Sequence, residues 1–431
     1  MINKIIMKLK GNKEVHNASW MILGRIIQMI LTFFVSIITA RFLGPSNYGI
    51  INYASAYVAF FTSLCTLGLD SIIVKDLIEN PKEQGTAIGT SIFMRGISSS
   101  IAIVLVILIV SIVDHGEKET IIVTTLCSIA LLFQSVDIIS YWFQSKYESK
   151  INTVATLVAY FISSVYKIIL LILKKNVRWF ALASSIDFIC CAFMLLLSYK
   201  KYKGPKLHVS IRKGKALLSQ SYHYILSGMM VAIYGQTDKI MLKQMLNERS
   251  VGYYSLAFSI NSMWVFVLTA VIASLTPTII SLYNEGKMEL FERKNRQLYA
   301  LIIYISIFVA VFFVLFGKKA VTLVYGEAYS PAGTTLKIIA WYTIFSYLGV
   351  ARNPWIVCTN NQKYLKYMYL SAAIINIILN ACLIPVFGTS GAAFASLITQ
   401  ICTSLILPAI IKDLRPNTRL MIDAIFLKKI K

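Results

Sequence analysis

The chain has 431 residues, of which 57% are hydrophobic and only 14% are charged. A soluble domain carries about 25% charged residues, so this composition excludes an ordinary soluble protein. The formal net charge of +23 also suggests nucleic-acid binding. However, the cations lie in short stretches between long apolar segments, which argues against nucleic acid as a partner and indicates a membrane protein.

About twelve apolar stretches of membrane-spanning length run from residue 17 to residue 411. A helix of about 20 residues crosses about 30 Å of hydrocarbon, and in lipid it satisfies its own backbone hydrogen bonds. We therefore predict an all-α integral membrane protein with about twelve transmembrane helices. The predicted spans are 17–40, 46–69, 87–113, 120–141, 151–173, 178–198, 217–242, 250–276, 297–316, 334–351, 365–385 and 389–411.

Lysine and arginine are unevenly divided between the two sides of these spans. About 28 lie in the termini and loops on one side, and 9 lie on the other. The richer side is expected in the cytoplasm, which places both termini and the linker 199–216 there. The apolar run 17–40 is too long for a signal peptide and is expected to be the first span. The seven cysteines form no C-x-x-C motif, and no metal site is predicted.

The two halves of the chain share a short motif. Residues 43–57 read LGPSNYGIINYASAY and residues 246–260 read LNERSVGYYSLAFSI, and an offset of 203 superimposes Gly49 on Gly252. This offset contains six predicted spans, so the two copies have the same orientation. We predict two six-helix lobes, 1–205 and 206–431, related by a pseudo-two-fold axis along the membrane normal. Transporters built from such repeats carry substrate between their halves.

Four segments resemble the Wzx-type polysaccharide flippases of the MOP superfamily, and they occur in the expected order along the chain. They are ARFLGPSNYGIINYASAY (40–57), QTDKIMLKQMLNERSVGYYSLAFSI (236–260), LVYGEAYSPAGTTLKIIAWY (323–342) and NIILNACLIPVFGTSGAAFASLITQ (376–400). The resemblance implies movement of an undecaprenyl-pyrophosphate-linked oligosaccharide from the cytoplasmic to the outer leaflet of a bacterial cytoplasmic membrane. It implies no cofactor and leaves coupling to H⁺ or Na⁺ open. Implied partners are the glycan-bearing lipid, membrane lipids, a polymerase and a chain-length regulator.

Ionisable residues inside spans are costly and are functional candidates by default. Arg25 and Arg95 each lie about eight residues from the cytoplasmic end of a span, with no acid nearby in sequence. Guanidinium groups match phosphate oxygens, so we predict that both arginines face a cavity between the lobes and receive a lipid diphosphate. Helix capping and contact with lipid phosphate are the alternative interpretation.

Other ionisable residues within spans are candidates for ion pairs or for coupling transport to an ion gradient. Lys167 and Asp187 lie on consecutive spans at similar depth, and they are candidates for a structural ion pair or a place in the substrate site. Asp238 and Lys239 are adjacent, so they point about 100° apart on a helix. Asp238 is a candidate for binding a proton or Na⁺, and a structural role for it is left open.

Polar residues near the start of the second span are further candidates for contact with sugar. Asn52 and Tyr53 lie in a stretch with two other tyrosines, Tyr48 and Tyr57. Tyrosine and asparagine suit sugar hydroxyls and water in a cavity. The competing interpretation places most tyrosines in the interfacial belt.

Two other functions compete with a flippase. A membrane polymerase or glycosyltransferase is disfavoured because the chain has no D-x-D sequence, and it also lacks a Walker A motif. A cation-coupled multidrug exporter shares the superfamily and the twelve-helix plan. Its cavity should be lined by acids, whereas the deep charges of the N-terminal half are Arg25, Arg95 and Lys167 against Asp137 and Asp187. This balance favours an anionic substrate.

Overall fold

The computed structural model describes residues 13–428, and no strand occurs in that part of the chain. This confirms the predicted all-α class. The N-terminus, which the charge count assigns to the cytoplasm, lies outside the described residues.

Two compact units make up the protein. The first comprises Met1–Leu43 and Tyr53–Ala232, and the second comprises Gly44–Asn52 and Ile233–Lys431. Two helices, α2 (Lys13–Cys65) and α9 (Ile211–Met245), contribute residues to both units. The other helices of the first unit are α3 (Ile73–Glu79), α4 (Gln84–Val113), α5 (Lys118–Gln134), α6 (Ile138–Ser145), α7 (Ser149–Ile172) and α8 (Val177–Lys201). Those of the second are α10 (Glu248–Ser262), α11 (Phe266–Asn284), α12 (Met288–Tyr325), α13 (Ser330–Ala351), α14 (Asn353–Cys358), α15 (Leu365–Phe387), α16 (Thr389–Ile401), α17 (Leu407–Ile410) and α18 (Arg415–Ile425).

All twelve predicted spans are helical. Nine helical segments in the described part of the chain are long and apolar enough to cross a membrane. One of them, Leu23–Cys65, contains two predicted spans, because α2 joins two helices at Gly44, whose φ of 70° interrupts the helical backbone. Two more predicted spans correspond to α9 and α13, which are helical but fall outside the nine.

The predicted boundaries are less accurate than the predicted spans. The span expected at 297–316 belongs to the much longer α12, and the one expected at 250–276 is divided into α10 and α11, which continues to Asn284. Charged residues can continue a helix beyond the hydrocarbon, whereas composition marks only its apolar part. Three predicted loops contain the short helices α3, α14 and α18.

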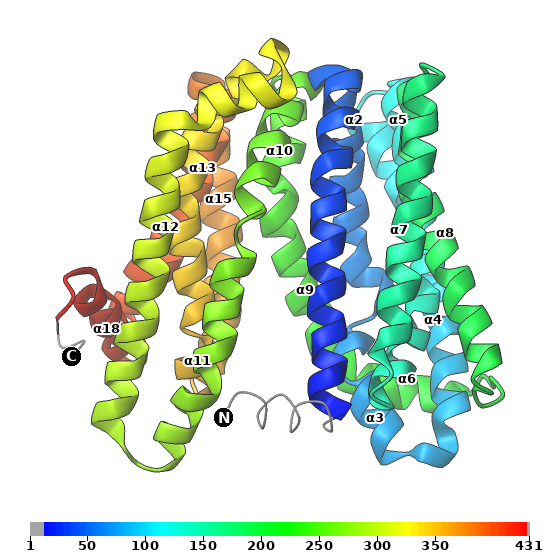
Figure 1. The fold of residues 1–431 in the computed structure, drawn as a ribbon, viewed down its shortest axis with the longest axis horizontal. Coiled ribbons are helices and arrows are strands. Elements are labelled where there is room, and N and C mark those ends of the chain that lie inside the picture. The colour runs from blue at the N-terminus through cyan, green and yellow to red at the C-terminus, as the bar shows by residue number, and fades with distance from the viewer. Residues whose placement is uncertain (1–12, 429–431) are drawn as a thin grey trace, which may run out of the picture. The chain divides into compact units, whose positions relative to one another are not determined.

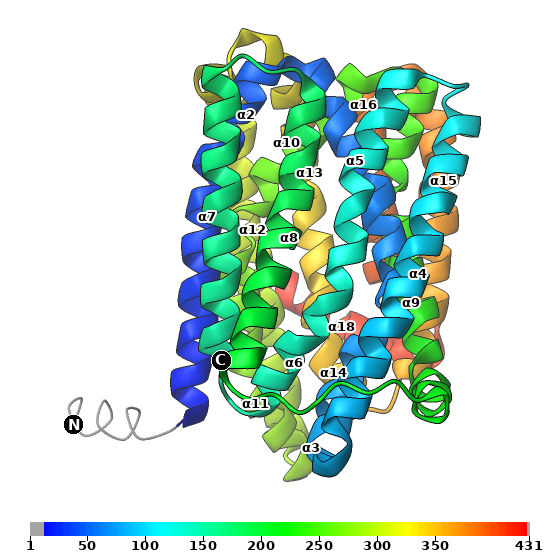
Figure 2. The same ribbon diagram turned by 90° about the vertical axis from the view of Figure 1, so that its right-hand side faces the viewer.

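Each unit has its own apolar core. In the first unit Trp142, Phe143 and Leu69 are fully buried, and in the second Leu298 and Leu348 are. The first part of α2 lies beside α7 in both views (Figures 1 and 2). Helix α18, red in Figure 1, packs against α12. These contacts bury one face of α18 on the second unit.

The linker after α8 is bound to the first unit. The amide of His208 donates to the carbonyl of Gly85 (3.3 Å), and Lys213 Nζ donates to Asp76 (2.9 Å) and Glu83 (3.0 Å). Partial burial would lower the pKa of Lys213, but the hydrogen bonds to the two acids raise it above its usual value. The compact units therefore divide within α9, at 232/233, and not at 205/206, where the sequence predicts the lobes to meet.

The two copies of the repeated motif pack against each other inside the second unit. A Cβ added to Gly49 would lie 1.8 Å from the carbonyl oxygen of Glu248, and one added to Gly252 would lie 2.1 Å from that of Pro45. Pro45 and Glu248 are themselves 203 residues apart, so the contact is reciprocal, as a local two-fold axis requires. Ser46 Oγ also donates to Glu248 Oε1 (2.6 Å). Only glycine permits this close approach of two helices.

Candidate functional site

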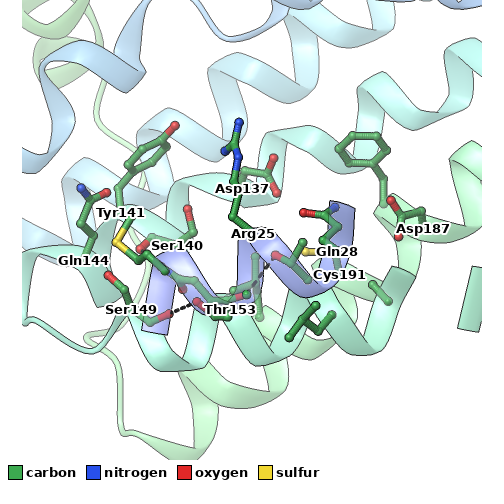
Figure 3. Close-up of a pocket in the computed structure, with 18 residues that line it drawn as sticks. Arg25, Gln28, Asp137, Ser140, Tyr141, Gln144, Ser149, Thr153, Asp187 and Cys191 are labelled. Carbon is green, nitrogen blue, oxygen red and sulfur yellow. Dashed lines mark hydrogen bonds between the residues drawn. The ribbon is translucent and has the colours of Figure 1, made fainter. Parts of the chain in front are cut away.

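A cavity of about 500 Å³ lies within the first unit, among α2, α6, α7 and α8. Its volume is in the range of small-molecule pockets, about 300–1,000 Å³. Figure 3 shows Tyr141 and Gln144 at one end of the group and Asp187 at the other, with Arg25 and Asp137 between them. The polar side chains that line the cavity are Arg25, Gln28, Asp137, Ser140, Tyr141, Gln144, Ser149, Asn152, Thr153, Thr156 and Asp187.

Arg25 lines this cavity from α2. The neighbouring Gly24 lets α2 approach α7 closely, since a Cβ there would lie 2.1 Å from Thr153 Cγ2. The Arg25 side chain is exposed, and none of the described residues accepts a hydrogen bond or forms a salt bridge with its guanidinium. It thus presents an uncompensated set of donors, which suits a planar anion.

Arg95 does not line the cavity, contrary to the prediction that it acts beside Arg25. Its side chain is fully buried, its Nη2 forms an ion pair with the carboxylate of Asp70, and its Nε donates to the carbonyl of Thr66 (3.1 Å). The sequence places Asp70 in a loop, but a 3₁₀ turn at Leu69–Ser71 brings it to α4. Arg95 therefore has a structural partner that sequence distance concealed.

Lys167 and Asp187 do not form the predicted ion pair. No salt bridge joins them in the described structure, although they lie close enough to interact electrostatically. Asp187 lines the cavity, and its Oδ1 is buried without a hydrogen-bond partner in the described part of the chain. Lys167 is not among the cavity's lining residues.

Asn52 and Tyr53 also lie away from the cavity. Asn52 Nδ2 donates to the carbonyl of Tyr48, one turn earlier on its own helix (2.9 Å). Tyr53 is completely buried, and its hydroxyl donates to the carboxylate of Asp114 (2.9 Å) and contacts the hydroxyl of Tyr57 (3.2 Å). The structure therefore assigns both side chains to helix packing and not to the cavity.

Asp238 is the centre of a buried polar network in the second unit. Its Oδ1 accepts from Asn380 (2.6 Å), and its Oδ2 accepts from Ser396 (2.6 Å) and from the hydroxyl of Tyr254. Three helices, α10, α15 and α16, supply these donors. Asn380 Oδ1 is buried without a partner in the described structure. The network thus combines one carboxylate, two hydroxyls and an unused amide oxygen.

Lys239 does not compensate Asp238. Its Nζ donates to Gln236 Oε1 (3.1 Å), and no salt bridge joins the two neighbours in the described structure. Sequence reasoning missed the partners of Asp238, although Asn376 and Asn380 lie four residues apart in an apolar span and hence on one helix face. Nor did it identify Gln28 and Asn152, which line the cavity of the first unit.

No group of three or more His, Cys, Asp or Glu side chains among the described residues could hold a metal ion. Most of the polar groups in the first unit's cavity are amides, hydroxyls and a phenol, with one guanidinium and two carboxylates. Such groups can hydrogen-bond a polyhydroxylated or phosphate-bearing molecule. They contain no arrangement of nucleophile and base that predicts bond cleavage.

Comparison with known families gives two matches. A family model described as "Polysaccharide biosynthesis protein" matches residues 15–283, and one described as MatE matches residues 224–382. The capsular polysaccharide biosynthesis protein CapF of Staphylococcus aureus is 22% identical over 397 residues, which are 90% of this chain and 96% of CapF. The probable flippase AglR of Haloferax volcanii is 27% identical over 190 residues, 42% of this chain and 40% of AglR.

Solved structures share the fold. An inward-facing multidrug resistance transporter of the MATE family, in the MOP superfamily, has a TM-score of 0.70 at 14% identity, covering 91% of this chain and 94% of its own. Lipid II flippase MurJ in an inward closed conformation has a TM-score of 0.68 at 15% identity, covering 94% of this chain and 90% of its own. At such identities the likeness concerns the fold alone.

Proposed function

This chain belongs to the family of polysaccharide biosynthesis proteins, and from that premise we propose that it is a flippase for a lipid-linked oligosaccharide. The family match confirms the resemblance found in the sequence. We further propose that the substrate is an undecaprenyl-pyrophosphate-linked repeat unit, carried from the cytoplasmic to the outer leaflet for a cell-surface polymer. Support comes from CapF, which resembles 90% of the chain, and from the fold shared with a lipid II flippase.

The observation that carries the proposal is the unpaired guanidinium of Arg25 in a cavity lined by sugar-compatible groups. Arginine binds phosphate through parallel hydrogen bonds, and amides and hydroxyls such as those of Gln28 and Asn152 can bond sugar hydroxyls. Asp137 and Asp187 fit this scheme as acceptors for such hydroxyls. Arg25 therefore receives the diphosphate, and the surrounding side chains receive the first sugars.

The cavity does not have the charge balance expected from the sequence. The sequence predicts three deep cations against two acids in the N-terminal half. However, Arg95 is paired with Asp70, and Lys167 does not line the cavity. The cavity itself holds one guanidinium and two carboxylates, Asp137 and Asp187. This balance, together with the MatE match, favours an exporter of organic cations as the second candidate function.

We propose that the Asp238 network couples transport to an ion gradient. Its carboxylate and amide oxygens are ligands that a hard cation prefers, and protonation of Asp238 would remove its charge and weaken the hydrogen bonds that it accepts from three helices. Either H⁺ or Na⁺ fits this role. The proposed setting is a bacterial cytoplasmic membrane, with both termini in the cytoplasm and a polymerase and a chain-length regulator as downstream partners.

Reconstituted vesicles separate the two functions. The purified full chain would be given a fluorescent polyprenyl-diphosphate oligosaccharide in one set of vesicles and ethidium in another. A flippase moves the labelled lipid between leaflets, measured by reduction of the exposed label, and leaves ethidium untouched. Ethidium export without lipid movement would instead establish the exporter. If neither probe moves while the protein is folded and an ion gradient is applied, both proposals fail.

A further inference from the structure

A second cavity, of about 270 Å³, lies in the second unit between the end of α11 and the start of α12. It is separate from the Asp238 network and from the Arg25 cavity, with which it shares no residue. Two residues of α11, Thr278 and Leu282, form one wall. The opposite wall is formed by Leu290, Arg293, Lys294 and Gln297 of α12.

The α12 residues of this wall form a single helix face. Their spacing is i, i+3, i+4 and i+7, which places the side chains in one stripe. The stripe has two cations, and no acidic side chain is among the described residues that line the cavity. Glu292, which lies beside the stripe in sequence, is engaged with Arg296 on another face (3.4 Å). The described side chains that line the cavity therefore carry a net positive charge, beside two leucines.

The ammonium group of Lys294 has N–H donors that are available to a ligand. Its Nζ donates to Gln297 Oε1 (3.0 Å), and an ammonium group has three N–H donors. Arg293 and Lys294 are half-buried, and Leu290 is exposed. An anion seated here would meet two cations, the amide of Gln297 and the hydroxyl of Thr278.

The cavity lies where the chain passes from polar to apolar sequence. Residues 287–297 of the α11–α12 connection and α12 contain most of the local charges, whereas residues 298–317 contain none. That transition is the level of lipid headgroups, and the acyl region begins at about the depth of residue 298. By the charge distribution it belongs to the cytoplasmic side, where basic pockets between transmembrane helices bind anionic headgroups.

We infer that the α11–α12 cavity is a binding site for an anionic membrane lipid, held through its phosphate group. Arg293 and Lys294 hold the phosphate, and Thr278 and Gln297, which lie deeper along their helices, supply further hydrogen bonds. Leu282 and Leu290 lie nearer the helix ends and contact the headgroup. The position of the cavity at the headgroup level favours a lipid over free phosphate. The phosphate can come from an anionic phospholipid or from the polyprenyl carrier, and the site does not depend on the function proposed above.

Native mass spectrometry of the full chain in detergent tests the inference, with dihexanoyl phosphatidylglycerol as the probe and dihexanoyl phosphatidylcholine as the reference. We expect one phosphatidylglycerol molecule to bind specifically. Its affinity should fall about 30-fold in the double variant Arg293→Gln/Lys294→Gln, from about fivefold for each cation near an anionic lipid. The matched control is Lys318→Gln/Lys319→Gln, which removes two charges at the other end of the same helix and should leave binding unchanged.

Competition then identifies the source of the phosphate. Displacement of phosphatidylglycerol by undecaprenyl phosphate would support the site and add the carrier lipid as an occupant, whereas no displacement would support a phospholipid alone. Glycerol phosphate should compete far more weakly than either lipid. The inference is overturned if phosphatidylcholine binds equally, if glycerol phosphate competes equally, or if the two double variants lose binding to the same extent. Equal thermal stability of both variants excludes misfolding as the cause.

Discussion

The two units differ in how the charged groups of their candidate sites are compensated. In the first unit, Arg25, Asp137 and Asp187 surround a cavity of about 500 Å³, and none of them forms a salt bridge with another in the described structure. In the second, Asp238 accepts hydrogen bonds from Tyr254, Asn380 and Ser396. A buried polar group without a partner is costly. The first unit is thus suited to a ligand or water, while the second stabilises its charge without either.

This difference assigns different tasks to two units that share a repeated motif. A cavity with unpaired donors and acceptors gains most when a molecule that can bond to them enters. A carboxylate whose hydrogen bonds are already formed gains little from a large ligand. If a proton or a small cation displaced its donors, the three helices that supply those donors would all be affected. This contrast supports the proposal of substrate recognition in the first unit and coupling in the second.

Removing the guanidinium of Arg25 should have the largest effect. We expect Arg25→Ala to abolish lipid flipping while the protein still inserts, because no other cation is among the described residues that line the cavity. Arg25→Lys should keep a part of the rate, since charge remains but the bidentate geometry is lost. Arg41→Ala is the matched control, because Arg41 is an exposed arginine on the same helix. Normal flipping by Arg25→Ala would move the anion site elsewhere.

The sequence predicted the helices well and the ion pairs poorly. Spans follow from the length of apolar stretches, which is a local property. The partner of Arg95 depends on a turn that returns Asp70 to α4 from 25 residues away, and no periodicity reveals this. Likewise, a similar predicted depth on consecutive spans does not establish that the side chains of Lys167 and Asp187 meet.

Part of the Asp238 network has a recognisable pattern in the sequence. Asn376 and Asn380 are two amides on one face of an otherwise apolar helix, which is the pattern of a buried polar network. Gly49 and Gly252 were found by their offset, but their direct contact required the structure. The polar lining of the first cavity comes from four helices, and a single chain cannot show which faces of those helices converge.

The second largest effect should follow from Asp238→Asn. Loss of one hydrogen bond to a charged group costs about 1.5–3 kcal/mol, and a barrier to transport raised by that amount makes flipping about 10- to 150-fold slower. If Asp238 couples transport, the residual flipping should no longer respond to an H⁺ or Na⁺ gradient, which would be measured in vesicles. Ser396→Ala removes one donor and should retain the ion dependence at a lower rate. An ion response that persists in Asp238→Asn would leave Asp238 a structural residue.

A moderate effect, on stability and not on transport, is expected at Arg95. Asp70→Asn removes the charge of the carboxylate that pairs with a buried guanidinium, so the free energy of unfolding should fall by about 2–3 kcal/mol. Once folded, the variant should flip lipid at the normal rate, because Arg95 does not line the cavity. Thermal unfolding in detergent and a flipping assay on the same preparation measure both quantities. A normal melting temperature with lost flipping would restore Arg95 to the substrate site.

The smallest effect is expected at Lys167. Comparing it with Asp187 separates a residue outside the first unit's cavity from one that lines it. Lys167→Gln removes a cation that forms no salt bridge in the described structure and does not line the cavity, so flipping should stay within about twofold, as for weak ion pairs. Asp187→Asn changes a lining residue whose Oδ1 is buried without a partner, and it should weaken substrate binding more than Lys167→Gln does. Initial flipping rates over a range of substrate concentrations separate binding from turnover. If the two variants lose activity equally and the double variant loses no more than either, Lys167 and Asp187 act as a pair during transport. Lys167 would then belong to the substrate site although it does not line the cavity.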